Sequence, residues 1–230
     1  MLYREGGKCI IVLHVDDLFV TGTKQDIEIV KESLKLKYKK VTSKQGDEIG
    51  YLGMWLVRKR NEKKMFISQP KHIKQLKSEF PNVYEYETPA SPNMPQTFDD
   101  VNIEMLNDEN KTFYRSCLMK AMYIARSRPD IKFILILLAT KMEEPNVADM
   151  KQLERVIGYL KKTENLVLTI KPMHMRLQAS ADASYAIHHD AKSHTGVVMT
   201  LGTSPVKSNS IKQKLVVKSS TEAELVALNS

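Results

Sequence analysis

The chain has only two cysteines, Cys9 and Cys117, among its 230 residues. Two cysteines provide no disulfide framework, and no charged-then-apolar signal segment opens the chain. We therefore expect an intracellular protein, cytoplasmic or nuclear and not secreted. The longest apolar block, Ile131 to Thr140, contains Lys132 and is far shorter than a bilayer span, so we expect no membrane partner. Glycine patterns of the Walker and dinucleotide-binding types are also missing from the sequence.

Positive charge is absent from one stretch of the chain. Residues 81–110 contain no Lys or Arg and have a net charge of −7, whereas residues 1–80 have +7 and residues 111–230 have +8. Two basic segments thus flank an acidic one. Excess Lys and Arg favour a polyanionic partner through counterion release, although a solvated surface is the commoner reason for scattered lysines. The hydrophobic content of 42% is sufficient for a real core and excludes a disordered chain.

Two adjacent carboxylates, Asp16 and Asp17, interrupt an apolar run from Cys9 to Val20. The β-branched residues of this run predict a β-hairpin with a largely buried surface, and acids avoid desolvation when they lie at its turn. Side by side, the two carboxylates repel each other unless a divalent cation lies between them. An acidic surface turn without a metal is the alternative, and Asp-Asp alone would favour it.

Helices and strands are expected to follow this hairpin. Thr23 and Asp26 resemble a capping box and predict a helix to about Lys40, with one apolar stripe packed on the core. The next expected elements are a strand over 51–57, a charged turn over 58–64, a strand over 65–68 and a helix that begins at Pro70.

The segment from Glu85 to Asn110 is rich in prolines and acids, which predicts a linker or a long surface loop. A helical module follows it. One helix is expected to open at Phe113 and to end at Arg128-Pro129-Asp130, and another, with apolar residues at helical spacing, ends at Lys161-Lys162. We expect these helices to bury their apolar stripes together.

The last part of the sequence predicts strands over 166–170, around Asp182 and over 195–200, and then a capped helix that starts near Ser219. An isolated Asp near a strand end is usually only a turn former or a helix cap. Three histidines, His188, His189 and His194, lack Cys partners and lie in a polar segment, so we expect a solvated loop there and not a zinc site.

Several phrases, in their order along the chain, resemble the Pol polyprotein of copia-type LTR retrotransposons. They are His14-Val15-Asp16-Asp17, Tyr51-Leu52-Gly53-Met54, Met65 to Ile73, Arg128-Pro129-Asp130-Ile131 and Ser219 to Leu225. The resemblance implies an α+β fold: a partial reverse-transcriptase palm of β-hairpins plus helices, a helical thumb or connection, and a truncated ribonuclease H-like α/β segment. The implied boundaries are 1–86 for the palm, 87–110 for an acidic Pro-containing linker, 111–165 for the helical part and 166–230 for the ribonuclease H-like part.

The resemblance also implies site residues. Asp16 and Asp17 would hold catalytic Mg2+ or Mn2+ for RNA-directed DNA polymerisation, and Asp182 with Glu224 would do so for hydrolysis of RNA in an RNA–DNA hybrid. The residues implied to lie near nucleic acid are His14, Leu52, Gly53, Met54, Lys63 and Lys64. The implied partners are RNA, DNA and RNA–DNA hybrid, together with the remaining polyprotein segments.

The sequence departs from the family pattern at two positions in or near these sites. His14 stands where an aromatic residue is usual, and Ser184 stands where copia-type enzymes commonly have a second Asp. We also expect the upstream palm acid and the later ribonuclease H acids to be missing, so that the isolated chain is inactive. The alternative function is a non-catalytic nucleic-acid-binding module, or one that completes a partner.

Overall fold

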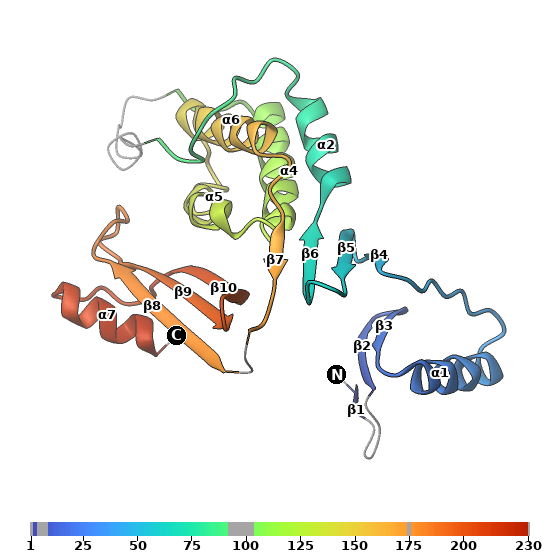
Figure 1. Cartoon of the computed structure of the whole chain (residues 1–230). Coiled ribbons are helices and arrows are strands. Elements are labelled where there is room, and N and C mark those ends of the chain that lie inside the picture. Colours follow the sequence, from blue (N-terminus) through green and yellow to red (C-terminus); the bar gives the residue numbers. More distant parts are fainter. Residues whose placement is uncertain (1, 4–8, 92–103, 174–175, 230) are drawn as a thin grey trace.

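The computed structural model describes residues 2–3, 9–91, 104–173 and 176–229. The described residues form a mixed α/β structure in which the strands lie in three separate antiparallel sheets (Figure 1). The expected mixture of helices and strands is thus confirmed. None of the helices in these ranges is both long and apolar enough to cross a membrane.

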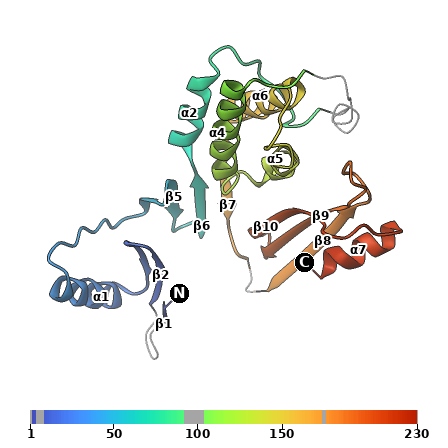
Figure 2. The same ribbon diagram turned by 180° about the vertical axis from the view of Figure 1, so that it is seen from behind.

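The first sheet has the order β1-β2-β3 and is followed by a helix. The elements are β1 (Leu2–Tyr3), β2 (Ile10–His14), β3 (Asp17–Thr21) and α1 (Lys24–Lys37). Thr23 caps α1 as predicted, because its side chain accepts a hydrogen bond from the N–H of Asp26 at 3.2 Å. The expected burial is wrong: α1 has no fully buried residue, and Val12 and Leu13 of β2 are 42% and 54% exposed. This unit lies away from the later helices (Figures 1 and 2), and the ring of Phe19 packs 5.2 Å from that of Tyr51.

The second sheet has the order β4-β5-β6-β7. Its strands are β4 (Glu48–Tyr51), β5 (Met54–Lys59), β6 (Lys64–Ser68) and β7 (Leu168–Ile170). The single strand predicted over 51–57 is wrong, because Leu52 and Gly53 have positive φ values of 46° and 70° and form a tight turn between β4 and β5. The last strand, β7, pairs with β6 although about a hundred residues separate them in sequence.

The main hydrophobic core belongs to the helices between β6 and β7. These are α2 (Pro70–Glu79), α4 (Asp108–Ile124), the 3₁₀ turn η1 (Pro129–Ile131), α5 (Lys132–Ala139) and α6 (Val147–Lys162). The predicted joint burial of apolar stripes is confirmed, with Leu118, Leu138 and Leu153 all fully buried in one cluster. Ile73 and Leu76 bring α2 into the same core, so the helix after β6 packs with the helical module (Figure 1).

The acidic stretch between α2 and α4 is only partly the loop that composition suggests. Residues 92–103 of the expected linker lie outside the described part. Before them, the chain packs on α6: a Cβ on Gly158 would lie 2.0 Å from the carbonyl oxygen of Tyr84, and Arg155 lies 4.4 Å over the ring of Tyr86. After them, α4 begins at Asp108 and not at Phe113 as expected, because the side chain of Asn107 caps it.

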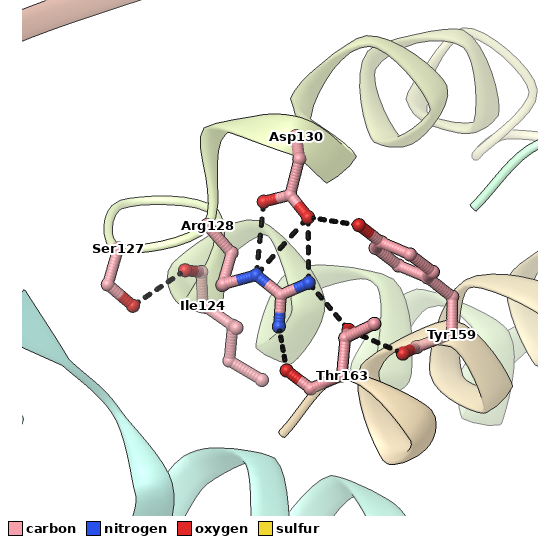
Figure 3. Close-up of polar contacts among 6 residues, drawn as sticks. All are labelled: Ile124, Ser127, Arg128, Asp130, Tyr159 and Thr163. Carbon is pink, nitrogen blue, oxygen red and sulfur yellow. Dashed lines mark hydrogen bonds and ion pairs between the residues drawn. The ribbon is translucent and has the colours of Figure 1, made fainter. Parts of the chain in front are cut away.

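A buried arginine joins the loop after α4 to the end of α6 (Figure 3). Arg128 is 2% exposed and forms an ion pair with Asp130, with Nη2 to Oδ2 at 2.7 Å. The same guanidinium donates to the carbonyl and the hydroxyl of Thr163 at 2.9 and 2.7 Å, and Tyr159 donates its hydroxyl to Asp130 at 2.8 Å. This network gives the Arg128-Pro129-Asp130 phrase a structural role in fixing the helices.

The third sheet has the order β10-β9-β8 and carries the last helix. The elements are β8 (Leu177–Ser184), β9 (His194–Leu201), β10 (Ser204–Lys212) and α7 (Ser220–Leu228). Helix α7 packs on β8 and β9, and Gln213 ties them together by donating to the hydroxyl of Thr195 and the carbonyl of Ala223 at 2.9 Å each. Helix α5 contacts the other outer strand, β10.

Candidate metal centres and nucleic-acid interface

Asp16 and Asp17 lie at the tip of the β2–β3 hairpin, as the sequence predicted. His14 and Asp17 are the last pair of the ladder, and Val15 and Asp16 form the turn between them. Val15 is 84% exposed and has a φ of 53°, a left-handed conformation that is uncommon for a β-branched residue. Asp16 in this turn and Asp17 at the start of β3 are both exposed to solvent.

Asp182 and Glu224 come from different elements and meet at one backbone amide. The N–H of Ala183 points to Oδ1 of Asp182 at 3.0 Å and to Oε1 of Glu224 at 3.3 Å. Strand β8 is one of the two outer strands of the described sheet, and only one of its edges pairs with β9. The N–H of Ala183 bonds to carboxylates and not to β9, so it points to the unpaired edge of β8. The two acids therefore converge at the edge of β8, on which α7 packs.

The start of α7 explains why Glu224 and not Glu222 reaches this edge. Ser219 caps the helix by accepting from the N–H of Glu222 at 3.2 Å, and Glu222 accepts from the N–H of Lys218 at 2.7 Å. Glu222 is thus part of the helix cap. Because Glu222 is held at the helix start, Glu224 is the carboxylate directed toward β8.

A cleft of about 280 Å³ lies between α5 and the third sheet, and Asp182 lines it. Gly196, opposite Asp182 in the ladder, is also a lining residue, and a Cβ placed there would meet no atom within 4 Å. On the other side, Lys132 donates to the carbonyl and hydroxyl oxygens of Ser208 at 2.6 and 2.7 Å. Solvent and a ligand therefore have access to the Asp182 side of the sheet.

The donor chemistry at both acid pairs is suited to a hard divalent cation. Carboxylate oxygens are the ligands that Mg2+ prefers, and Mg2+ is usually bound by one or two carboxylates plus water and substrate phosphates. None of Asp16, Asp17, Asp182 and Glu224 forms an ion pair with Lys, Arg or His in the described part of the chain. Within that part, no group of three or more His, Cys, Asp or Glu residues is arranged to hold a metal. Each pair thus fits one ion as a partial ligand set.

Leu52, Gly53 and Met54 lie at the β4–β5 turn, where sequence reasoning missed two packing partners. A Cβ on Gly53 would lie 2.6 Å from Nε2 of His72 and 2.8 Å from the hydroxyl of Tyr123. The same tyrosine donates its hydroxyl to the carbonyl of Leu52 at 2.5 Å. The turn is therefore fixed against α2 and α4, and this packing alone requires glycine at position 53.

Lys63 and Lys64 lie at the opposite end of the same sheet, in the turn between β5 and β6 and at the start of β6. They border a hollow of about 400 Å³. Its other lining residues are Arg58, Lys59, Arg60, Met65, Ile170 and Pro172. The expected role of the two lysines in nucleic-acid binding stays a prediction. The structure shows that three further cationic residues line the same hollow.

The prediction of a solvated histidine loop is wrong for two of its three members. His188 and His194 are 8% and 3% exposed, and their Nε2 and Nδ1 atoms are 3.0 Å apart. His194 also bonds to the hydroxyl of Ser210 at 2.7 Å and packs edge-on against Phe133. Burial, and next the charge of His188, lower the pKa of His194 to about 4. The missed signal was the strand that starts at His194, which turns its side chain toward α5.

Comparison with known proteins identifies relatives across nearly the whole chain. A retrovirus-related Pol polyprotein from transposon RE1 of Arabidopsis thaliana is 30% identical over 224 residues, 95% of this chain and 15% of the relative. The polyprotein from transposon TNT 1-94 of Nicotiana tabacum is 27% identical over 231 residues, 98% of this chain and 17% of the relative. An uncharacterized mitochondrial protein of Arabidopsis thaliana is 27% identical, and the matched region is 89% of its length. The chain thus spans less than a fifth of these two polyproteins. No protein-family model and no solved structure matches it.

Proposed function

Because the chain is homologous over most of its length to retrovirus-related Pol polyproteins of transposons, we propose that it is a retroelement-derived segment with parts of two metal-dependent phosphoryl-transfer sites. One part is the end of a reverse-transcriptase palm with its helical thumb or connection. The other is the start of a ribonuclease H-like domain. The partners are RNA, DNA and RNA–DNA hybrid, and the remaining polyprotein segments supply what each site lacks.

The convergence of Asp182 and Glu224 carries this proposal. Residues 42 positions apart reach the same N–H at the open edge of β8, from a strand and from a helix. Asp182 and Glu224 would hold Mg2+ or Mn2+, which when bound lowers the pKa of water and stabilises the leaving oxygen in hydrolysis of RNA. The cleft beside Asp182 leaves the approach to this edge open. The antiparallel order β8-β9-β10 followed by α7 supports the ribonuclease H-like assignment.

Asp16 and Asp17 are proposed as two ligands of the polymerase site. The hairpin holds them on a strained turn, with His14 directly opposite Asp17 in the ladder. Imidazole at the family's aromatic position places a polar ring beside the acids. A complete polymerase site requires a third carboxylate, which the described residues do not bring to this tip.

A non-catalytic nucleic-acid-binding module is the second candidate. Two observations favour it: neither acid pair is joined by a third ligand within the described residues, and a hollow lined by five cations lies apart from both pairs. Phosphate contacts by Lys and Arg hold a protein on nucleic acid without any catalytic residue.

Binding of Mn2+ to the purified chain separates the two candidates. The metal-site proposal expects Mn2+ binding that is lost when Asp182 and Glu224 are replaced by Asn and Gln. A chain that binds RNA–DNA hybrid but no Mn2+ would be a binding module only. Cleavage of a labelled hybrid in Mg2+ or Mn2+ then tests whether the bound ion supports hydrolysis.

A further inference from the structure

Five cationic side chains surround one hollow at the end of the second sheet. Arg58, Lys59, Arg60, Lys63 and Lys64 come from the end of β5, the turn and the start of β6, and the end of β7 closes the hollow with Ile170 and Pro172. Strand β6 runs directly into α2, so the turn lies at the end of the sheet away from the helical core (Figure 1).

The arrangement of these charges is unfavourable for the free protein. Lys59 and Lys64 are direct cross-strand partners in the β5–β6 ladder, and like charges in that position destabilise a sheet. Lys63 lies in the turn with a φ of 51°, a left-handed conformation that a glycine or asparagine would adopt at less cost. Neither feature stabilises the folded chain.

The neighbouring acids do not neutralise the hollow. Asp47 pairs with Arg60 at 2.6 Å and Glu62 pairs with Lys64 at 2.8 Å, whereas Arg58, Lys59 and Lys63 form no ion pair within the described residues. The hydrogen bond from Lys64 and then its charge hold the pKa of Glu62 below its ordinary value, and Lys59 and Lys171 add to this effect. Five cations thus face two carboxylates.

Two lysines of α1 are arranged differently. On α1, Lys31 pairs with Glu28 and Lys35 pairs with Glu32 in the i, i+3 spacing that balances charge along a helix. Scattered pairs of this kind need only water. The hollow gathers unbalanced charge on one concave surface, where the field on a bound anion is strongest.

We propose that this hollow binds phosphate groups of a nucleic-acid backbone. Arg58 and Arg60 present planar forks suited to phosphate oxygens, and the lysines act as mobile point charges. The remaining lining residues are Met65, Ile170 and Pro172, with no aromatic ring on which a base would stack. The contact is therefore to backbone phosphate, with little dependence on base sequence. The identity of the polyanion rests on the proposed function, whereas the preference for phosphate rests on the hollow alone.

The test replaces the three cations that have no ion pair. The variant R58Q/K59Q/K63Q keeps the Arg60–Asp47 and Lys64–Glu62 pairs, and the control K37Q/K39Q/K40Q removes the same charge near the end of α1. Binding of a labelled RNA–DNA hybrid is measured by fluorescence anisotropy at several salt concentrations. In the hollow variant we expect at least about tenfold weaker binding at low salt, and a salt slope lower by about 0.9 for each lost contact. The control should retain the affinity and the slope of the unmodified chain.

Two results overturn the proposal. One is an equal loss in both variants, which indicates only a general effect of net charge, and the other is unchanged binding in the hollow variant. Inorganic phosphate, compared with chloride at equal ionic strength, tests the source of the phosphate. Displacement of hybrid by millimolar phosphate alone would assign the hollow to a free phosphate compound and would also overturn the proposal.

The same experiment separates the hollow from the proposed function. If R58Q/K59Q/K63Q does not affect hybrid binding, the phosphate-binding role of the hollow is refuted, but the proposed retroelement function is not. If the unmodified chain does not bind hybrid at low salt, both the phosphate-binding role of the hollow and the proposed nucleic-acid partner are refuted. Mn2+ binding at Asp182 and Glu224 is independent of both outcomes.

Discussion

Asp182 and Glu224 accept from the same N–H group, that of Ala183, at the open edge of strand β8. One donor cannot satisfy two carboxylates, and no cation of the described chain pairs with either acid. Two negative charges so placed repel each other. A bound divalent cation removes this repulsion, which is why the pair is the strongest candidate metal site in the described structure.

Metal binding is expected to require both of these acids. Asp182→Asn or Glu224→Gln should weaken Mn2+ binding by at least about tenfold, because each change removes one of two charged ligands. Isothermal titration or Mn2+ electron paramagnetic resonance measures the loss. The control is Glu222→Gln, which alters the capping acid and should leave Mn2+ affinity within about twofold. Equal losses in all three variants would assign the effect to α7 and not to the metal ligands.

Polymerase activity is expected to be absent from residues 1–230 alone. The described hairpin tip brings together Asp16 and Asp17 but no third ligand, which is too few to position two ions and a triphosphate. Primer extension on RNA and DNA templates with Mg2+ or Mn2+ checks this. Incorporation that disappears in Asp16→Asn would show that the two acids suffice.

Gly53→Ala should destabilise the chain by about 1–3 kcal/mol. The substitution places a Cβ at a φ of 70° and within 2.6 Å of His72, so both strain and overpacking oppose it. Urea unfolding measures the loss. Gly196→Ala is the matched control, because a Cβ there meets nothing within 4 Å, and its effect should stay within about 0.5 kcal/mol. If Gly53→Ala costs as little as the control, the β4–β5 turn is not packed as described.

Arg128→Met should destabilise the helical core by about 2–3 kcal/mol, because it leaves Asp130 without its cation. This predicted loss of stability is smaller than the loss expected for a fully buried ion pair, because the Asp130 side chain is 35% exposed. Burial alone would raise the pKa of Asp130, but hydrogen bonds from Arg128 and Tyr159 outweigh it and lower the pKa. The contribution of the pair is therefore present above the ordinary aspartate pKa and is lost as the pH falls below it. Lys151→Met, on the exposed face of α6, is the control for thermal unfolding.

Acidification should destabilise the third sheet through His194. Its pKa is lowered from 6.5 to about 4, so the folded state holds the neutral ring while the unfolded state binds a proton. The stabilisation is complete above pH 6.5 and is lost as the pH falls toward 4, with a total of about 3 kcal/mol. His194→Gln should flatten this part of the stability profile, and His189→Gln, at an exposed position, should not. Parallel profiles for the unmodified chain and His194→Gln would count against the buried pair.

Local chemistry made much of the candidate site predictable from the sequence. The turn at Asp16, the cap of α1 at Thr23 and the cap of α7 at Ser219 all involve groups within a few residues of each other, so short-range hydrogen bonds and strand propensity determine them. The single strand expected around Gly53 was wrong because a left-handed two-residue turn interrupts an apolar run without changing its composition.

Tertiary structure alone decided the features that join distant parts of the chain. The pairing of β7 with β6 cannot be predicted from local sequence. Nor can the direction of the His194 side chain, which packs against Phe133 of α5. The meeting of Asp182 with Glu224 was implied only by a family resemblance, and it depends on α7 packing against β8. The hollow around Lys63 likewise exists because β7 closes one side of a hairpin that it does not adjoin in sequence. Long-range burial of apolar surface sets these arrangements, and local propensity does not encode it.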